Sequence, residues 1–333
     1  MTAMSAPPVL LLSRAAIAQL AATRDYLAAM QTAFADLAAG RFDLPAVGHV
    51  PGVGGMFHIK AAQRAGSPAL AVIKVNGNFP NNRVQHNLPT IQGFVALLDA
   101  ERGCVLALLD SIEITARRTA AATALAAKYL AKPDSRTLAM IGCGVQALYH
   151  VEALRDVASL ETVVFCDPSD EAADAFAAHM RTLELDARRV ADPKAAARGA
   201  DIVVTVTTST RSLLALGDVD PGTFVAGVGA DNPSKHELAV DLMQASRVIV
   251  DSVTQASTMG DLHHAIAAGA LQAKDVRGEL ADLVVGRVAG RSSGDERWLF
   301  DSTGLSIQDL AAAEMIYERA RAAGGVPEIL LGN

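Results

Sequence analysis

The sequence has few cysteines and few aromatic residues, and this scarcity already excludes some classes of protein. Its 333 residues include three cysteines, no C-x-x-C pair and a single tryptophan. Such sparse cysteines exclude a disulfide framework and are typical of buried, reduced thiols in a cytosolic protein. We therefore expect Cys104, Cys143 and Cys166 to be ordinary buried residues. We predict no metal site, because no histidines stand near them at metal-ligand spacing.

The sequence also lacks a long apolar run and an excess of positive charge. The apolar fraction is 51%, but Arg117, Arg118 and Lys128 interrupt the alanine-rich segment long before the roughly 18 apolar residues that a membrane-spanning helix needs. Lys and Arg number 29 against 36 Asp and Glu, giving a formal net charge of -7 without a basic run. This balance excludes the electrostatic pattern of a nucleic-acid binder. The expected partners are small molecules and a second copy of the chain.

A secretory signal is missing as well. The first residues, "MTAMSAPPVLLLSR", have no positively charged start and an apolar core of only four residues. We therefore expect a cytoplasmic protein without a membrane anchor.

From residue 137 onward, short β-branched runs alternate with helix-like stretches. The runs are "TLAMIG", "ETVVFCD", "DIVVTVTT", "TFVAGVG" and "SRVIVDS". Continuous apolar runs of this kind are typical of parallel strands that are covered on both faces. The predicted fold class is α/β, with a Rossmann-type, doubly wound parallel sheet over residues 116–304.

The first 110 residues follow a different pattern. After helical stretches at 13–20 and 24–39, "MFHIKAA", "ALAVIKVNGN", "TIQGFVALLDA" and "CVLALLD" are predicted strands of a second sheet. The segment "STGLSIQDLAAAEMIYERARAAG" predicts an amphipathic helix that packs back on this region. Residues 1–115 and 305–333 are therefore predicted to form a second, mixed α/β domain.

A glycine turn follows the strand "TLAMI". Gly142, Gly144 and Ala147 match the dinucleotide fingerprint, in which the first glycine allows a tight turn and the second lets the backbone approach a pyrophosphate. The amide end of the next helix favours phosphate groups. Asp167, at the end of the next strand, would accept hydrogen bonds from ribose hydroxyls and repel a 2′-phosphate. The turn predicts NAD, with NADP less favoured; the alternative is a nucleotide-free domain with an incidental glycine turn.

Several charged residues are candidates for the chemistry. Lys74 lies in an apolar strand, where a charge is unfavourable unless it is paired or meets an anionic ligand. The segment "DSIEITARRTAAATALAAKYLAKPD" predicts a helix that connects the two domains. Arg118 and Thr119 lie near the start of this helix, where a guanidinium and the helix dipole favour a carboxylate or phosphate. Asp231 follows a strand at the ligand-binding edge of the parallel sheet and could move a proton or hold an ammonium. The alternative for Lys74 is a surface lysine, and that for Arg118 and Thr119 is a solvated helix face. The alternative for Asp231 is a helix cap.

Histidines and one more lysine complete the candidates. His58 and Lys60 stand two residues apart in "FHIKAA" and point the same way as Met56, so they are predicted to line the substrate pocket. His263 and His264 are predicted to be a pair on a helix surface, outside any metal site.

Six motifs occur in order between about residues 40 and 320: "KVNGNFPNN", "LPTIQG", "ITARRTAAATALAAKYLA", "IGCGVQA", "GADNPSKHEL" and "FDSTGLSIQD". Together they resemble the ornithine cyclodeaminase and mu-crystallin superfamily, which includes archaeal-type alanine dehydrogenases and ketimine reductases. The resemblance implies a homodimer whose mixed α/β domain makes the subunit contact and holds the substrate, while the Rossmann-type domain holds the cofactor. It also implies that Lys74 and Arg118 hold the substrate carboxylate and that Asp231 works on the substrate amine. Lys74 and Asp231 are the expected catalytic residues. The expected cofactor-binding residues are Thr119, Gly142, Gly144, Val145, Gln146, Asp167, Thr207, Ser302 and Gly304.

The sequence departs from this family at two places near the expected substrate site. Many members carry an arginine or lysine near position 45, two residues after a proline, where this chain has Val47. The common "MP" near position 60 is replaced by Ile59, Lys60 and Ala61. Lys60 could supply part of the missing positive charge, so the identity of the substrate stays open.

The chemistry implied by the resemblance is hydride transfer from Cα of an amino acid to NAD, which leaves an imine. The main expectation is therefore an NAD(P)-dependent amino-acid dehydrogenase or imine (ketimine) reductase. One alternative is a lyase, ornithine cyclodeaminase, which converts L-ornithine to L-proline and ammonia. The other is a non-catalytic NAD(P)H-binding protein of the lens-crystallin kind. The cofactor motifs do not separate these alternatives, because the pocket beyond Cα decides the fate of the imine.

Overall fold

The computed structural model describes residues 7–45 and 47–331. The chain divides into two compact units, one containing the residues up to Arg118 and those from Leu305 onward, the other containing Thr119–Gly304. The boundary predicted between residues 115 and 116 lies inside helix α4 (Ser111–Leu130). Because α4 continues from the first unit into the second, no loop or change of composition marks the boundary in the sequence.

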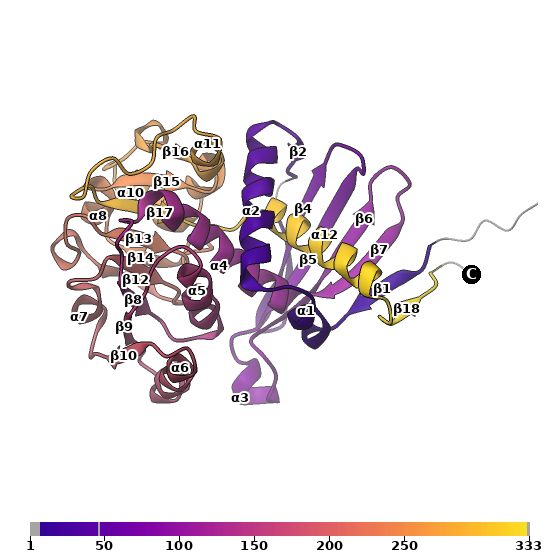
Figure 1. The fold of residues 1–333 in the computed structure, drawn as a ribbon, viewed down its shortest axis with the longest axis horizontal. Helices are drawn as coiled ribbons and strands as arrows, with labels where there is room; N and C mark the ends of the chain where they lie inside the picture. Colours follow the sequence, from indigo (N-terminus) through magenta and orange to yellow (C-terminus); the bar gives the residue numbers. More distant parts are fainter. Residues whose placement is uncertain (1–6, 46, 332–333) are drawn as a thin grey trace, which may run out of the picture. The chain divides into compact units, whose positions relative to one another are not determined.

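The first unit is built on an eight-stranded, mostly antiparallel sheet (Figure 1). Its centre is formed by the four predicted strands, which pair in chain order as β4 (Gly55–Arg64), β5 (Leu70–Asn78), β6 (Ile91–Asp99) and β7 (Val105–Asp110). The edges are β1 (Val9–Leu12) and β18 (Glu328–Ile329) on one side, and β2 (Phe42–Asp43) and β3 (Gly48–Gly52) beside β4 on the other. The sequence analysis does not predict β1, because four apolar residues after a proline pair are too short a signal.

Helix α12 (Ser306–Ala323) lies across one face of this sheet (Figure 1). It contacts strands β4 to β7 and helix α2 (Thr23–Ala38), and α1 (Arg14–Leu20) packs nearby. The prediction that the C-terminal helix is amphipathic is wrong for its first half, because residues 306–313 are all buried. A helix segment enclosed by a sheet and another helix has no solvent face to produce an amphipathic pattern.

The two faces of the sheet differ in what covers them. Along β5, Leu70, Val72 and Lys74 are buried, whereas Ile73 between them is 39% exposed. The register places Val75 of β5 opposite Phe94 of β6, which is 44% exposed. Side chains of alternating positions point to opposite faces, so the face away from α12 is apolar and open in the described chain. The face toward α12 carries Lys74.

The second unit contains an eight-stranded sheet in which every described pairing is parallel. Its order is β10-β9-β8-β11-β13-β17-β15-β16, so the chain winds to one side of β8 and then to the other, which is the doubly wound fold that the sequence predicts. The strands are β8 (Thr137–Ile141), β9 (Thr162–Cys166), β10 (Asp186–Arg189), β11 (Ile202–Thr205), β13 (Phe224–Gly227), β15 (Arg247–Val250), β16 (Gly278–Glu279) and β17 (Trp298–Asp301).

Strand β17 is an addition that the sequence analysis does not predict. It lies between β13 and β15, and all four of its residues are buried. The preceding segment, 285–297, carries many polar and glycine residues, so a four-residue run after it gives little periodic signal. Its carboxyl end carries Ser302 to Gly304 to the same sheet edge as the glycine turn.

Helices and a small two-stranded sheet complete the second unit. Strand β12 (Thr210–Leu214) pairs with β14 (His236–Leu238) beside the main sheet. The helices are α5 (Val145–Arg155), α6 (Asp170–Thr182), α7 (Pro193–Ala197), α8 (Val240–Gln244), α9 (Val253–Ala256), α10 (Gly260–Ala267) and α11 (Leu280–Val284), and the first unit adds the short α3 (Asn82–His86).

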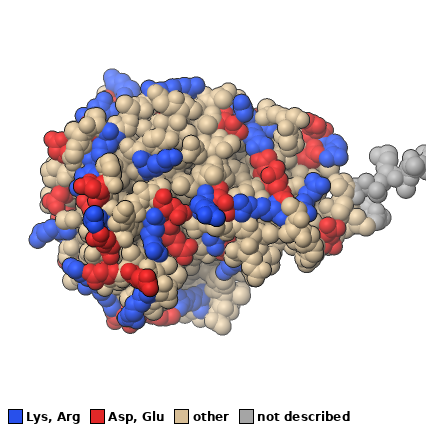
Figure 2. Space-filling model, in the orientation of Figure 1, with Lys and Arg blue, Asp and Glu red and all other residues tan. Residues whose placement is uncertain are grey.

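Two general properties of the described chain are its surface charge and the hydropathy of its helices. Acidic and basic side chains are intermingled on the face shown in Figure 2. Within the described residues, no helix is both long and apolar enough to span a membrane.

Candidate active site

The glycine turn lies at the point where the parallel sheet changes winding direction. Strand β8 ends at Ile141, and Gly142 follows with φ of +93°, a conformation that favours glycine. A Cβ on Gly142 would lie 3.0 Å from Thr207 Cγ2, whereas a Cβ on Gly144 would meet nothing within 4 Å. Helix α5 then begins at Val145, and no side chain caps its amide end. The turn thus presents helix amides and an open glycine to an anionic group.

Asp167 is fixed beside this turn. Its Oδ2 accepts a hydrogen bond from the Cys143 N–H at 2.7 Å, and its Oδ1 accepts one from the Ser169 N–H at 2.8 Å. A carboxylate has about four acceptor positions, so two bonds leave capacity for further donors such as ribose hydroxyls. The contact with Cys143 joins the ends of β8 and β9, which sets the carboxylate at the edge of the turn.

Glu237 binds together the loops that follow β11 and β13. Its side chain is buried and accepts hydrogen bonds at 2.7 Å from Thr205 Oγ1, from both the N–H and Oγ1 of Thr207, and from the Gly229 N–H. Burial raises the pKa of Glu237, although these hydrogen bonds oppose the shift. The loop containing Thr207 is therefore held rigidly next to the loop that leads to Asp231.

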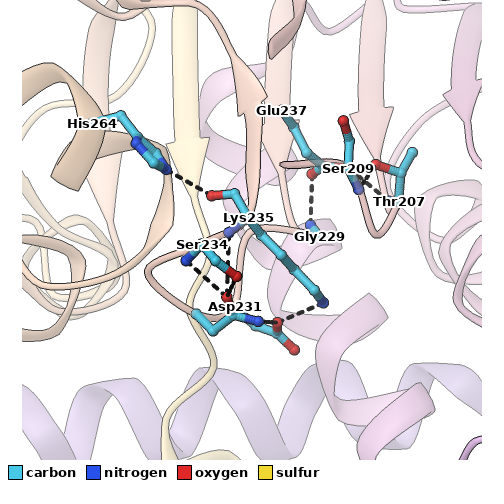
Figure 3. A network of polar contacts seen from close by, with 9 residues as sticks. Thr207, Ser209, Gly229, Asp231, Ser234, Lys235, Glu237 and His264 are labelled. Carbon is cyan, nitrogen blue, oxygen red and sulfur yellow. Dashed lines mark hydrogen bonds and ion pairs between the residues drawn. The ribbon is translucent and has the colours of Figure 1, made fainter. Parts of the chain in front are cut away.

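Asp231 lies on a compact, cross-linked loop (Figure 3). Its Oδ1 is 2.7 Å from Lys235 Nζ, and the Asp231 side chain is 56% exposed. Asn232 Oδ1 accepts hydrogen bonds from the backbone N–H groups of Ser234 and Lys235, which closes the loop. The Lys235 carbonyl oxygen lies 2.8 Å from His264 Nε2. Asp231 is thus exposed at the surface of this unit, on a loop whose conformation is fixed by these contacts.

The structure places His264 in a half-buried position, whereas the sequence analysis predicts a residue on a helix surface. Its ring stacks on His236 with centroids 4.1 Å apart, and it contacts the Lys235 carbonyl. The sequence does not reveal this contact because Lys235 and His264 are 29 residues apart. Within the described residues, no group of three or more His, Cys, Asp or Glu side chains is arranged to hold a metal ion.

The segment from Ser302 to Gly304 follows β17 and is held by a buried carboxylate. Asp251 accepts hydrogen bonds from the Thr303 N–H at 2.9 Å, the Thr303 Oγ1 at 2.7 Å and the Gly304 N–H at 2.5 Å. Ser302 is 3% exposed, and its Oγ has no hydrogen-bond partner among the described residues. Gln146 Oε1, at the start of α5, is likewise buried without such a partner.

These observations fit a dinucleotide at the end of the parallel strands. The open backbone at Gly144 and the uncapped helix end suit a pyrophosphate, and the remaining acceptor positions of Asp167 suit ribose hydroxyls. Ser302 Oγ and Gln146 Oε1 are polar atoms for which a polar ligand would supply partners.

The first unit contains a separate cluster of buried charges. Lys74 and Arg118 are each 4% exposed, and both contact Asp309, which is 0% exposed. Lys74 Nζ lies 2.7 Å from Asp309 Oδ2, and Arg118 Nε lies 3.1 Å from Asp309 Oδ1. Burial lowers the pKa of Lys74 to about 7, against the attraction of Asp309. The pKa of Asp309 is lowered, because Lys74 and Arg118 outweigh the opposing effect of burial.

Gln308 extends this cluster with an unused donor. Its Oε1 accepts a short hydrogen bond from Arg118 Nη1. Its Nε2 is buried and has no hydrogen-bond partner among the described residues. The cluster therefore combines two cations, one carboxylate and a free amide donor, an arrangement suited to an anionic ligand.

His58 and Lys60 lie on the same face as Lys74. The register of β4 and β5 places Lys60 directly opposite Lys74, and His58 opposite Asn76. Thr119, the residue after Arg118 in α4, is buried and begins the second unit. The candidates for substrate binding thus gather in the first unit, whereas Asp231 and the glycine turn belong to the second.

Comparison with known proteins decides the family. The model of the ornithine cyclodeaminase/mu-crystallin family matches residues 9–324. The chain belongs to this family.

Characterised relatives and solved structures cover nearly all of this family member. An alanine dehydrogenase of Archaeoglobus fulgidus is 32% identical over 311 residues, covering 93% of this chain and 95% of the relative. A solved archaeal alanine dehydrogenase dimer with bound NAD is 31% identical with a TM-score of 0.91, covering 97% of this chain and 99% of that one. The iminosuccinate reductase of Paracoccus denitrificans in complex with NAD+ is also 31% identical, with a TM-score of 0.90 and coverage of 98% and 100%.

Our sequence analysis does not select three residues that take central positions in this family member. Asp309 and Gln308 contact the candidate substrate anchors, and Glu237 holds the loops next to the glycine turn. A polar Gln–Asp pair within the first turn of an otherwise apolar, buried helix is a signal that could have pointed to the first two. The acidic residue of "GADNPSKHEL" could have pointed to Glu237.

Proposed function

We propose that this family member is an NAD-dependent oxidoreductase that transfers a hydride between nicotinamide and Cα of a small amino or imino acid. It would act as an amino-acid dehydrogenase or an imine reductase. The observation that carries the proposal is the buried cluster of Lys74, Arg118 and Asp309, a ready site for a carboxylate in a chain that also has an intact dinucleotide turn. The NAD complexes of its relatives support the choice of cofactor.

The residues at the end of the parallel strands would hold NAD, which when bound supplies the hydride acceptor or donor. Gly142, Gly144, Val145 and Gln146 would face the pyrophosphate, and Asp167 would accept from the adenosine ribose. The negative charge of Asp167 disfavours a 2′-phosphate, which is why NAD is preferred to NADP. The remaining proposed contacts are Thr119, Thr207, Ser302 and Gly304.

Lys74 and Arg118 would bind the substrate carboxylate. Arg118 supplies a guanidinium with several N–H donors, and Asp309 holds this group in one orientation. The lowered pKa of Lys74, about 7, also allows this lysine to exchange a proton near neutrality. His58 and Lys60, on the same face, would contact the more distant part of the substrate.

Asp231 would act on the substrate amine. In the described structure its carboxylate is engaged by the ammonium of Lys235 at 2.7 Å. Because Lys235 contacts Oδ1, a substrate ammonium can bind the other carboxylate oxygen, Oδ2, while the ion pair persists. Asp231 would then take up the proton that the amine releases as the amino acid becomes an imine.

The reaction balances as follows in the oxidative direction. An amino acid and NAD+ give an imino acid, NADH and a proton, and water then converts the imino acid to a keto acid and ammonia. Imine reduction is the first step in reverse. The same residues serve both directions, because proton transfer to and from the nitrogen passes through the same carboxylate.

We further propose that the protein is a cytoplasmic homodimer. The apolar sheet face that includes Ile73 and Phe94 is suited to pairing with a second copy, and one similar structure is a dimer. Light scattering is expected to give twice the monomer mass, and a monomeric mass would contradict this assembly. The three free cysteines, of which Cys143 and Cys166 are buried, support a reducing compartment.

The test of the activity is to incubate the purified protein with NAD and a panel of amino acids, following NADH and ammonia together. We expect NADH and ammonia to rise in equal amounts. Proline and ammonia from ornithine at constant NADH would identify a cyclodeaminase instead. NADH binding without turnover of any amino or imino acid would identify a binding protein.

A variant of Asp231 tests the role of this carboxylate in the same assay. Asp231→Asn should abolish turnover, while Asp134→Asn, at an exposed position, serves as the matched control.

A further inference from the structure

The starting observation is a buried amide donor that the fold does not use. Gln308 stands in the first turn of α12 and is 0% exposed. Its Oε1 accepts a hydrogen bond from Arg118 Nη1, whereas its Nε2 has no hydrogen-bond partner among the described residues. A buried donor without an acceptor is unfavourable, because it has given up its hydrogen bonds to water. A ligand with an acceptor atom would supply the partner.

The chemistry of Arg118 decides which end of this amide is unused. A guanidinium has N–H donors and no acceptor, so the oxygen of the Gln308 amide has to face Arg118. Turning the amide over would bring two donor groups against each other. The NH2 group therefore faces away from Arg118 Nη1, and it is the part of the side chain that can serve a ligand.

Three buried donor groups gather around the first turn of α12. Asp309, the next residue after Gln308, has its Oδ1 3.1 Å from Arg118 Nε and its Oδ2 2.7 Å from Lys74 Nζ. A guanidinium has five N–H donors and an ammonium has three, so these contacts leave further N–H groups on both cations. A set that consists of donors suits a group with two acceptor oxygens and a negative charge, which is a carboxylate.

We propose that Gln308 donates a hydrogen bond to the substrate carboxylate and makes the site select acids against the corresponding amides. This inference rests on the function proposed above and adds a specificity-determining residue to it. When an acid binds, the Gln308 NH2 group gains a charged acceptor, and hydrogen bonds of this kind are about twice as strong as neutral ones. When an amide binds in the same position, its own NH2 group meets that of Gln308, and both donors stay unsatisfied.

The first test measures the binding of propionate and propionamide to the protein with NAD, by NMR titration. These probes have no amine to oxidise, and they differ only in the exchange of one carboxylate oxygen for NH2. The wild-type protein should bind propionate at least about tenfold more tightly than propionamide. Gln308→Glu keeps the oxygen that faces Arg118 and replaces the donor by an acceptor, so it should weaken propionate binding and strengthen propionamide binding. An unchanged propionamide affinity would overturn the proposal, because a negative charge that is merely nearby would weaken propionate without strengthening the neutral amide.

A second variant removes the amide altogether. Gln308→Met has a side chain of similar length without a donor, and it should weaken propionate binding by about 10- to 100-fold. Gln272→Glu, at an exposed position in the second unit, is the matched control for the charge change and should leave both affinities at their wild-type values. A propionate affinity that Gln308→Met leaves unchanged would contradict the proposal. If this variant does not fold, the Gln308→Glu comparison still decides, because that variant retains the acceptor for Arg118.

The NH2 group of Gln308 also gives a direct spectroscopic signal. In protein that contains isotope-labelled glutamine, its resonance is identified by its loss in Gln308→Glu. The proton resonance should move downfield as propionate saturates the wild-type protein, because a carboxylate becomes its acceptor. A resonance that stays in place at saturation would overturn the proposal.

Kinetics separate this inference from the proposed function. For the amino acid that the wild-type protein oxidises best, the ratio of kcat/KM for the acid to that for its amide should fall at least about tenfold in Gln308→Glu. A ratio that stays the same would overturn the role of Gln308 and leave the proposed function intact. Absence of wild-type turnover on every amino and imino acid would instead overturn the proposed function, while the selection of propionate would still be decided by the binding measurements.

Discussion

Asp309 lies 2.7 Å from Lys74 Nζ and 3.1 Å from Arg118 Nε, and all three side chains are buried. One carboxylate thus holds two cations that belong to a strand and a helix far apart in the sequence. Without it, Lys74 and Arg118 would repel each other inside the protein. Asp309 is therefore central to the stability of the proposed substrate site as well as to its charge.

Asp309→Asn is expected to destabilise the protein by about 3 to 5 kcal/mol, because it leaves two buried cations without their counterion. Denaturant unfolding measures the change. Asp25→Asn is a suitable control, because Asp25 pairs with Arg319 in a partly exposed bridge at 2.7 Å and should cost less than about 1 kcal/mol. Similar losses in the two variants would show that the buried cluster has no special role.

The pH dependence of kcat/KM should reflect the protonation state of Lys74. Its pKa is lowered from 10.5 to about 7, mainly by burial, so the charged form that binds a carboxylate is lost as the pH rises through this value. We expect kcat/KM for the amino or keto acid to fall above about pH 7, tenfold per pH unit. Lys74→Arg stays charged and should remove this break from the profile. A wild-type profile that is flat between pH 6 and 9 would exclude Lys74 as a carboxylate anchor.

Asp167→Ser should relax the preference for NAD over NADP. The variant removes the charge that repels a 2′-phosphate, and the serine hydroxyl can still donate a hydrogen bond to it. We expect the ratio of kcat/KM for the two cofactors to shift toward NADP by on the order of tenfold or more. Asp170→Ser, in the exposed first turn of α6, controls for general loss of charge. An unchanged ratio would argue against contact between Asp167 and the ribose.

Lys235→Met should impair the presentation of Asp231. The variant removes the ion pair at 2.7 Å that fixes the carboxylate, and misplacing a reacting group by about 1 Å can cost on the order of a hundredfold in rate. We expect kcat to fall by about 10- to 100-fold with a smaller change in KM for the cofactor. Lys235→Arg should restore much of the rate. If loss of the lysine leaves kcat unchanged, the ion pair does not position Asp231.

Asp301 should make the protein less stable as the pH rises from acid to neutral. It is fully buried, and burial raises its pKa from 3.8 to about 7, with Asp251 adding to the shift. Between these values the folded state holds a proton that the unfolded chain releases, so the free energy of unfolding falls with increasing pH. Asp301→Asn can still accept the hydrogen bond from the Leu262 N–H. Its Tm should exceed the wild-type Tm at pH 8, and the gap should narrow below pH 5; a lower Tm throughout would contradict this account.

Much of this protein was determined by local sequence. Continuous β-branched runs gave the parallel strands, because a strand covered on both faces has to be apolar along its length. Gly142 and Gly144 gave the turn, because φ of +93° and close approach of backbone each restrict the choice of residue. Lys74 was evident as a charge in an apolar strand, and the six motifs gave the family, which the comparison with known proteins confirms.

Only the tertiary structure determined which charged side chains contact each other. Asp309 is 235 positions from Lys74 and reaches it only because α12 returns to cover β5, and β17 joins the sheet from beyond a polar segment. The opposition of Lys60 and Lys74 depends on the register of two strands, which a shift of one residue would abolish. Charge balance is a property of which side chains share a buried space. A sequence shows the charged residues, but only the folded chain shows which of them compensate each other.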